Sequence, residues 1–407
     1  MNLEEVRRVE FPETERITFL DAACVSFAPQ RAVKALTDFV NYCSRNDEES
    51  SSAHHIAMDE KRQKAYIEAA KLLNADIDEI ALVESTTHGL NIAATSIPLN
   101  RGDKILTTSL EFLQVAMPWC MMRKKQGIRV EVIQGQDGRF EKEDFENAID
   151  ENTKIIVISS VEWCNGWKMD LKELGQLCKE KGVYLVVDAI HHLGVNRIDV
   201  KEVHIDILMS GGHKWLNSPF GTGVLYVNKE LIPRIDPVFW GYLNLEEPEG
   251  GWPAYFENPK ITPVNDWKFR QTANKFEIGG TSNYPGAIAL GESLELINEI
   301  GIENIEKHVF ELTEYAMGRL KEIGATLITH PDKKHRSGIV IFRFYNSIKE
   351  EEKLLEELHE NGVYVAMRFT SNIGGIRVSC HYFNTKGDID KLIEALKKVA
   401  EVKKPDY

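Results

Sequence analysis

Residues 205–227 read IDILMSGGHKWLNSPFGTGVLYV, and this stretch decides how the middle of the chain folds. A first apolar run ends in a Ser-Gly-Gly turn, Lys214 follows, and a second apolar run begins after another glycine-rich turn. Apolar runs of this length between turn residues are typical of strands that are buried on both faces. A lysine among glycines and aromatic residues would be shielded from water, which lowers the pKa of an ammonium group. A solvated loop lysine is the plainer interpretation.

Similar apolar runs alternate with helical patterns on the N-terminal side of this stretch. The runs at 80–83, 104–108, 130–133, 154–159, 184–188 and 205–210 predict strands, and 59–73 and 171–181 predict helices. This alternation is typical of an α/β fold, in which a mostly parallel central sheet is covered by helices. After residue 285, long amphipathic helices and a few strands predict a smaller α+β C-terminal domain. We expect an N-terminal segment at 1–20 packing with the small domain, a large ligand-binding domain at 21–284 and the small domain at 285–407.

The composition excludes several classes of function. The chain has 63 acidic and 49 basic residues, a net charge of −14, which argues against a nucleic-acid or anionic membrane partner. No run approaches the ~20 apolar residues of a membrane helix, and residues 1–10 lack the apolar core of a signal peptide. The six cysteines show no paired spacing, so we expect reduced thiols, no metal site and a cytoplasmic location.

Three polar elements are expected at one edge of the predicted sheet. Asp188 ends the strand at 184–188, and Lys214 stands 26 residues later, about one strand and its connection away. Both would lie at the edge where open α/β folds bind ligands. In 80–96, IALVESTTHGLNIAATS, a strand is followed by hydroxyl residues and a helical pattern, and a helix N-terminus favours an anion such as phosphate. Taken singly, the aspartate and the threonines are more often helix N-caps.

Together these elements match one ligand, with an aldehyde for Lys214, a ring nitrogen for Asp188 and a phosphate for residues 86–88. Pyridoxal 5′-phosphate (PLP) carries all three groups. The sequence resembles the class V group of fold-type I PLP-dependent enzymes, which includes class V aminotransferases, cysteine desulfurases and isopenicillin N epimerase. The matching words are LDAACVSFAP (20–29), ESTTHGLN (84–91), VVDAIHHLG (186–194), GGHKWLNSPFGTGVLYV (211–227), FEIGGTSN (276–283) and IRVSCHYFNT (376–385). HKW followed by PFGTG is most similar to the isopenicillin N epimerase-like branch.

The resemblance implies a role for individual residues. Lys214 would bind the cofactor covalently and move the α-proton of the substrate, while Asp188 keeps the ring nitrogen protonated. The other implied cofactor contacts are Thr86, Thr87, His88, Ser210 and His213 at the phosphate, Phe112 on the ring, His191 near the phenolic oxygen, and Thr281, which reaches the phosphate of a neighbouring subunit. A homodimer with shared active sites follows. Arg377 matches the carboxylate-binding arginine, and Trp163 and Ala23 are expected at the substrate, so the implied substrate is an amino or keto acid.

Departures from the family pattern bear on the reaction. Phe112 stands where desulfurases carry a ring-stacking histidine, and 366–375, AMRFTSNIGG, lacks the cysteine that receives sulfur as a persulfide. Gly211 replaces the usual phosphate-binding serine, which leaves Ser210 one step earlier. Trp163 takes the place of an asparagine near the phenolic oxygen, with Asn165 as a substitute.

We therefore expect an aminotransferase, because a single lysine base suffices for its proton shift. The alternatives are a β-lyase that cleaves a C–S bond without a persulfide cysteine, and an amino-acid epimerase, for which no second base is evident. A scaffold protein that has lost its cofactor is disfavoured, because Lys214, Asp188, Thr87 and Arg377 are all present.

Two further segments have open interpretations. The long insertion at 240–274, rich in Trp, Pro, Glu and Asn, could line a large pocket or pack at a dimer interface. His54 and His55 lie in an expected polar loop, at the place where related enzymes approach the substrate from the partner subunit. Ordinary surface or interface histidines are the alternative.

Overall fold

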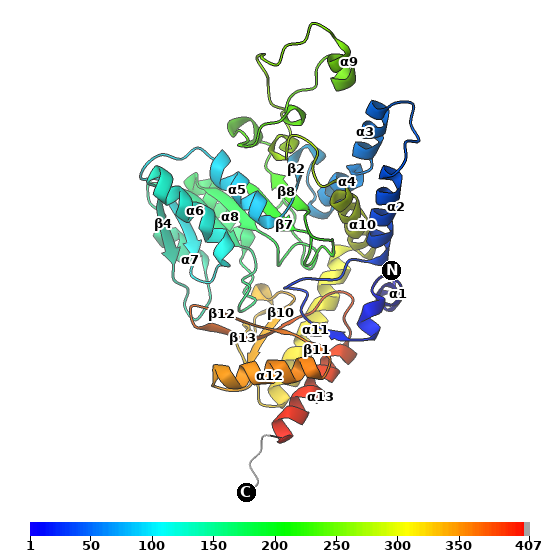
Figure 1. The fold of residues 1–407 in the computed structure, drawn as a ribbon. Helices are drawn as coiled ribbons and strands as arrows, with labels where there is room; N and C mark the ends of the chain where they lie inside the picture. The colour runs from blue at the N-terminus through cyan, green and yellow to red at the C-terminus, as the bar shows by residue number, and fades with distance from the viewer. Residues whose placement is uncertain (403–407) are drawn as a thin grey trace.

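The computed structural model describes residues 1–402, and its centre is a seven-stranded sheet in the order β2-β8-β7-β6-β5-β3-β4 (Figure 1). The strands are β2 (Ile80–Val83), β3 (Lys104–Thr108), β4 (Arg129–Ile133), β5 (Thr153–Ser159), β6 (Tyr184–Asp188), β7 (Ile207–Gly211) and β8 (Gly223–Val227). All pairings are parallel except those of β8, which runs antiparallel to both neighbours. The prediction of an α/β fold with a mostly parallel central sheet is confirmed.

Alternate residues of the central strands are buried on opposite faces of this sheet. Ile156 and Ile158 of β5 belong to one apolar cluster, whereas Ile155 and Val157 belong to another. Because successive strand residues point to opposite faces, a strand buried on both sides is apolar throughout. The helices around the sheet are α4 (Gln63–Leu73), α5 (Thr86–Ser96), α6 (Leu113–Gln126), α7 (Lys142–Ala148), α8 (Leu171–Lys181) and α10 (Tyr284–Ile300).

The C-terminal part has a second sheet, with four strands in the order β12-β13-β10-β9. Its pairings are antiparallel. The elements of this part are α11 (Ile302–Glu322), β9 (Thr326–Leu327), β10 (Ile339–Arg343), α12 (Ile348–Glu360), β11 (Val363–Tyr364), β12 (Ala366–Thr370), β13 (Ile373–Ser379) and α13 (Lys386–Val402). This mixture of helices and an antiparallel sheet is the α+β arrangement expected after residue 285.

The N-terminal segment contacts this C-terminal part. β1 (Thr18–Phe19) pairs in parallel with β11, and Arg7 of α1 (Leu3–Glu10) forms an ion pair with Asp388. The ring of Phe11 lies 4.8 Å from that of Phe383. These contacts hold the segment against the C-terminal part, while the exact domain bounds at 20/21 and 284/285 stay a prediction.

Two sequence expectations in the N-terminal third need correction. The helix predicted at 59–73 is two helices, α3 (Ser51–Glu60) and α4, separated by Lys61 and Arg62. His54 and His55 therefore lie on a helix rather than in a loop. α2 (Gln30–Cys43) precedes them and packs with α4 against α10 (Figure 1). Within residues 1–402, no helix is both long and apolar enough to cross a lipid bilayer.

The insertion at 240–274 extends away from the central sheet and contains the short helix α9 (Gly251–Glu257) (Figure 1). Its residues Tyr242, Trp252 and Phe256 line a cavity of about 520 Å³ together with His55 of α3. None of the predicted site residues lines this cavity. The insertion thus forms a pocket of its own, separate from the sheet edge where Asp188 and Lys214 lie.

Candidate active site

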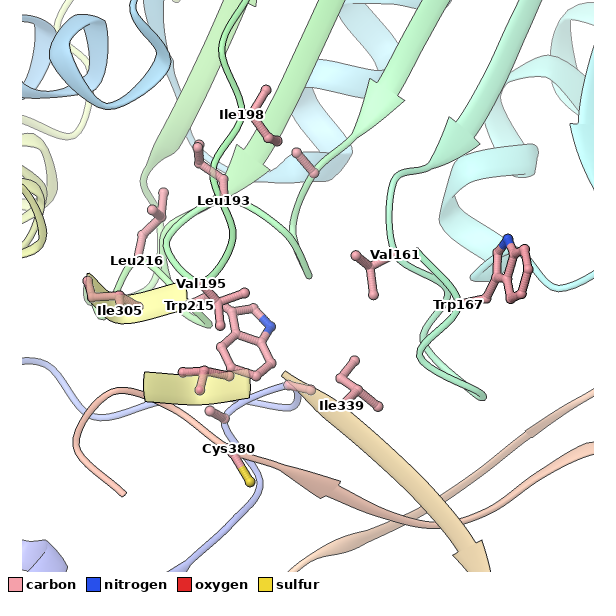
Figure 2. Packing of buried hydrophobic residues seen from close by; sticks show 14 of the residues in the cluster. Val161, Trp167, Leu193, Val195, Ile198, Trp215, Leu216, Ile305, Ile339 and Cys380 are labelled. Carbon is pink, nitrogen blue, oxygen red and sulfur yellow. The ribbon is translucent and has the colours of Figure 1, made fainter. Parts of the chain in front are cut away.

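The carboxyl ends of β6 and β7 bring Asp188 and Lys214 to one edge of the sheet. The two strands are parallel neighbours, and Asp188 pairs in register with Met209. Trp215, the residue after the lysine, is fully buried beside Ile339 and Cys380 of the C-terminal part (Figure 2). Because a close-packed indole cannot shift without opening a void, its burial fixes the backbone of Lys214.

The imidazole of His191 connects Trp215 to Lys214. Trp215 Nε1 donates to His191 Nδ1 over 3.2 Å, and His191 Nε2 lies 3.4 Å from Lys214 Nζ. Burial, followed by the charge of Lys214, holds the pKa of His191 well below its usual range, so the ring is neutral. A neutral ring that accepts at Nδ1 carries its proton on Nε2. That N–H can donate only to a lysine in its free amine form.

Lys214 loses its proton more easily than an ordinary lysine. Burial lowers the pKa of Lys214 to about 8, although the carboxylate of Asp188 opposes the change. The positive charge of Arg377 contributes to the lowering. An uncharged amine is the nucleophile that reacts with an aldehyde. The surroundings of Lys214 therefore suit the covalent role that the sequence predicts.

Asp188 is a buried carboxylate whose Oδ1 accepts a hydrogen bond from the Ile190 N–H over 2.9 Å. Burial raises the pKa of Asp188 to about 6, while the Ile190 N–H and the charge of Lys214 oppose the rise. At neutral pH the side chain is an anion in surroundings that favour a cationic partner. A protonated ring nitrogen is such a partner.

Two more buried carboxyls lie close to Asp188. Thr108 donates its hydroxyl to Glu162 Oε1 over 2.6 Å, and the same hydroxyl lies 3.2 Å from Glu111 Oε1. Ser159 donates its N–H and its O–H to Glu111 over 2.8 and 2.6 Å. Burial is the largest cause that raises the pKa of both glutamates, and the charge of Asp188 adds to it. The cluster therefore retains a proton at neutral pH.

The start of α5 and the turn after β7 form a cradle for an anion. The N-cap Ser85 accepts a hydrogen bond from the His88 N–H over 3.1 Å, and the Gly211 N–H donates to Thr86 Oγ1 over 2.8 Å. A Cβ at Gly211 would lie 3.0 Å from that hydroxyl and 3.2 Å from the ring of His213. A side chain at this position would require Thr86 or His213 to move by a few tenths of an ångström. The structure thus brings Thr86 and His213 together at a helix N-terminus, where phosphate binds well.

The remaining predicted cofactor residues differ in their surroundings. Thr87 is exposed on α5, and His88 Nδ1 lies 2.5 Å from Glu84 Oε2. Ser210 is buried, and its hydroxyl donates to the Gly211 carbonyl over 3.3 Å. Thr281 is exposed between η5 (Ala273–Phe276) and α10, as a residue that reaches a second subunit would be. The roles of these four residues stay predictions.

The substrate side of the site gathers around Arg377 of β13. Arg377 is only 1% exposed and donates to Asp21 Oδ1 over 3.1 Å and to the Trp163 carbonyl over 3.4 Å. Its buried Nε has no partner in the part of the chain that the structure describes. The ring of Trp163 packs edge-on against Phe112, with 5.3 Å between centroids. Ala23 is buried two residues after Asp21. A guanidinium with a free N–H in a buried place suits a carboxylate ligand.

Four residues near the site were missed by the sequence analysis. Cys24 and Arg368 lie in contact with one another, and their charges act on both Lys214 and Arg377. Glu111 and Glu162 form the carboxyl cluster. Cys24 and Arg368 stand in words that the sequence analysis quoted, and Glu111 and Glu162 stand next to Phe112 and Trp163, but only the fold shows that they meet.

Asn165 does not replace the asparagine expected near the phenolic oxygen. Its amide nitrogen donates to the Gly138 carbonyl over 2.7 Å, and its oxygen accepts from the Trp167 N–H over 2.9 Å. Both ends of the amide are thus engaged by neighbouring backbone.

The donor set fits PLP. A lysine with a lowered pKa lies near a buried carboxylate, the Thr86 hydroxyl stands at a helix N-terminus that suits a phosphate, and a buried arginine keeps one donor free among the described residues. A family model described as Aminotransferase class-V matches residues 18–392. The chain belongs to the aminotransferase class-V family. This class V enzyme is PLP-dependent, which confirms the cofactor predicted from the sequence.

Curated relatives of this class V enzyme match it along nearly its whole length. The probable cysteine desulfurase of Pyrococcus abyssi is 27% identical over 413 residues, with 98% of each chain covered. The probable cysteine desulfurase of Methanothermobacter thermautotrophicus is 27% identical over 414 residues, again with 98% of each chain covered. These relatives are named for the C–S chemistry that the sequence analysis kept as an alternative.

Solved structures show the same fold. The apo cysteine desulfurase from Thermococcus onnurineus superposes with a TM-score of 0.86 at 24% identity and 99% coverage of both chains. The cystine C–S lyase C-DES, in complex with its product cysteine persulfide, superposes with a TM-score of 0.84 at 21% identity, covering 95% of this chain and 99% of its own. These likenesses confirm the fold-type I prediction.

Proposed function

We propose that this class V enzyme cleaves the C–S bond of cysteine or of a closely related amino acid. The observation that carries the proposal is the end-to-end similarity to curated proteins named cysteine desulfurase, at 27% identity and 98% coverage of both chains. This similarity favours C–S bond cleavage, the alternative in the sequence analysis, over the aminotransferase reaction that the sequence analysis expected. The site geometry supports amino-acid chemistry in general, and the comparisons favour its C–S branch.

Arg377 is the proposed binding group for the substrate carboxylate. It is anchored by Asp21 and by the Trp163 carbonyl, while its Nε remains free for an incoming oxygen. Burial removes competing water and strengthens a charge-assisted hydrogen bond. The anchor thus fixes the amino acid at one end, so that its α-carbon faces Lys214.

Lys214 and His191 are proposed to handle the α-proton. Bound PLP acts as an electron sink for the pair of electrons left when the proton leaves. His191 Nε2, 3.4 Å from Lys214 Nζ, orients the amine, and the low pKa of the ring keeps the histidine from protonating at neutral pH. Lys214, with its pKa near neutrality, can accept and return a proton. Asp188 would hold the ring nitrogen of bound PLP in its protonated form.

A homodimer in the cytoplasm is also part of the proposal. The exposed rings of Phe220 and Phe239 border the phosphate cradle, the first 4.9 Å from His213 and the second 5.9 Å from His88. Exposed apolar side chains beside a binding site are typical of surfaces that a partner covers. All six cysteines, which lie within the described residues, are free thiols, as suits a reducing compartment.

A product assay tests this proposal. The PLP-loaded enzyme is incubated with cysteine, cystine and sulfur-free amino acids, and alanine, sulfide, pyruvate with ammonia, keto acids and inverted amino acids are measured separately. We expect products of C–S cleavage only, and we expect Lys214→Ala to lower their rate by at least ~10⁴-fold. The proposal would be contradicted if a sulfur-free amino acid and an amino acceptor gave keto acids faster than any C–S cleavage. The enzyme would then be an aminotransferase.

A further inference from the structure

We propose that Cys24 receives the sulfur atom of the substrate, in place of the loop cysteine that this chain lacks. The proposal rests on the C–S cleavage function and names a further catalytic residue for it. The sequence analysis expected any C–S cleavage to proceed without a persulfide cysteine, whereas this proposal assigns that role to Cys24.

Cys24 lies in a short turn that joins the two ends of the substrate site. The turn begins at Asp21, whose carbonyl accepts from the Cys24 N–H over 3.0 Å and whose carboxylate accepts from Arg377 over 3.1 Å. The turn ends at Ser26, whose N–H donates to the carbonyl of His213, next to Lys214, over 2.8 Å. The turn that carries Cys24 thus contacts Arg377 at one end and the residue before Lys214 at the other, and Cys24 itself is exposed.

The sulfur has a cationic neighbour. Arg368 of β12 donates from Nη2 to Cys24 Sγ over 3.6 Å. Cysteines beside arginine or lysine, with access to solvent, are the reactive ones. Arg368 stands in the short hairpin that takes the place of the cysteine-bearing loop, so the same segment that lacks the cysteine supplies a cation to another one.

An independent feature points to a ligand at this position. Arg377 is 1% exposed, yet its Nε has no hydrogen-bond partner among residues 1–402, although a buried donor normally has one. A substrate carboxylate would satisfy this N–H. An amino acid bound there, with its α-carbon toward Lys214, brings its side chain to the turn that carries Cys24.

Four of the other five cysteines are poorly placed for this role. Cys164, Cys178 and Cys380 are buried, and burial raises the pKa of all three thiols, that of Cys164 and of Cys380 to about 12. Cys43 is exposed on α2, and its Sγ contacts Met58 Sδ at 3.7 Å rather than a cation. Cys43 is therefore a matched control for Cys24.

The proposed step balances without an added oxidant. The Cys24 thiolate attacks the sulfur of bound cysteine, an S–S bond forms, and the Cβ–S bond breaks with its electron pair passing to carbon. The carbon takes up a proton, so cysteine leaves as alanine and Cys24 becomes a persulfide. The proton given up by Cys24 is matched by the proton taken up by the product, and the net reaction is cysteine plus thiol to alanine plus persulfide.

The first test uses the enzyme without PLP, so that turnover plays no part. The rate of alkylation by iodoacetamide is measured for each cysteine by peptide mass mapping. We expect Cys24 to react about tenfold faster than Cys43, and we expect Arg368→Gln to remove the difference. Equal rates in the wild-type protein would contradict the role of Arg368 as the activating cation.

The second test loads PLP and supplies cysteine without any other thiol. We expect about one alanine per active site, after which the reaction stops, and one added sulfur atom on the Cys24 peptide but not on the Cys43 peptide. Cys24→Ser should lose this alanine, whereas Cys43→Ser should keep it. Lys214→Ala should leave Cys24 unmodified, which excludes sulfur acquired by chance from solution.

The outcomes separate the two proposals. Continuous formation of pyruvate, ammonia and sulfide, equal in the wild-type enzyme and in Cys24→Ser, would overturn the role of Cys24 and leave the C–S cleavage function intact. Alanine formation by Cys24→Ser at the wild-type rate would also overturn it. The absence of any C–S cleavage, with the visible absorbance of bound PLP present, would overturn the proposed function itself.

Discussion

The cofactor side and the substrate side of the site are built in different ways. On the cofactor side, Asp188, His191 and Lys214 come from the end of β6 and from the turns that follow β6 and β7, and they lie within 26 residues of each other in the sequence. On the substrate side, the residues that meet come from the N-terminal turn, from the segment after β5 and from the β12–β13 hairpin. Arg377 and Asp21, for example, are 356 positions apart.

This difference explains why the cofactor is easier to infer than the reaction. Neighbouring strands of a parallel sheet bring their carboxyl ends together whatever the rest of the chain does. The substrate side exists only after the C-terminal part docks on the large sheet, with Trp215 buried beside Ile339 and Cys380 at the contact (Figure 2). The chemistry of the substrate is thus set where sequence-distant segments meet.

The largest expected effect is on the cofactor side. Asp188→Asn removes the anion that would pair with the ring nitrogen, and we expect kcat to fall about 10²–10³-fold with every substrate that the enzyme accepts. In the unloaded protein the same change removes the charge that raises the pKa of Lys214, so that pKa should fall below its present value of about 8. The pH dependence of Lys214 labelling by an amine reagent, followed by peptide mass, measures this shift.

Lys34, an exposed lysine in the same digest, reports the pH dependence of the reagent itself. A Lys214 labelling profile that is unchanged in Asp188→Asn would show that the two groups are electrostatically independent. In that case the charge of Asp188 would not set the pKa of Lys214.

A smaller effect is expected on the substrate side. Arg377→Lys keeps a cation for Asp21 but loses the planar pair of donors, so we expect KM for the amino acid to rise about 10–100-fold. The visible absorbance of bound PLP should not change, because Arg377 belongs to the other side of the site. Arg319→Lys, at a surface ion pair with Asp390, is the control. A changed absorbance with an unchanged KM would assign Arg377 to the cofactor.

The sequence predicts the central strands well because each is an unbroken apolar run between turn residues. β2, β3 and β6 have the expected bounds, and the prediction for β7 differs only by one or two residues at each end. The helix predicted at 59–73 divides at Lys61 and Arg62. The prediction missed this break because the hydrophobic periodicity of the sequence continues across it.

The missed site residues had no local signal. Glu162 follows β5 and Glu111 follows β3, and nothing in either segment shows that the two carboxyls share the hydroxyl of Thr108. Likewise, Cys24 and Arg368 are 344 positions apart, so their contact depends on the docking of distant parts. Pairing of this kind is long-range, and a single sequence contains no periodic pattern that reports it.

The smallest expected effect tests whether the carboxyl cluster is a protonated part of the cofactor side. Burial raises the pKa of Glu162 well above its usual range of about 4.3. At pH values above 4.3, the folded protein therefore holds a proton that the unfolded chain has released. Unfolding then releases a proton, so the free energy of unfolding falls as the pH rises.

Glu162→Gln removes this dependence, since an amide does not titrate and can still accept the hydroxyl of Thr108. We expect the free energy of unfolding to fall with pH more steeply in the wild-type protein than in the variant, by up to about 1.4 kcal/mol per pH unit between pH 5 and pH 8. Urea unfolding of the unloaded proteins at several pH values measures the difference, and Glu352→Gln, at an exposed position on α12, is the matched control. A difference that stays constant with pH would mean that Glu162 is ionised in the folded protein. Asp188 would then lie beside a second negative charge, which would repel the Asp188 carboxylate.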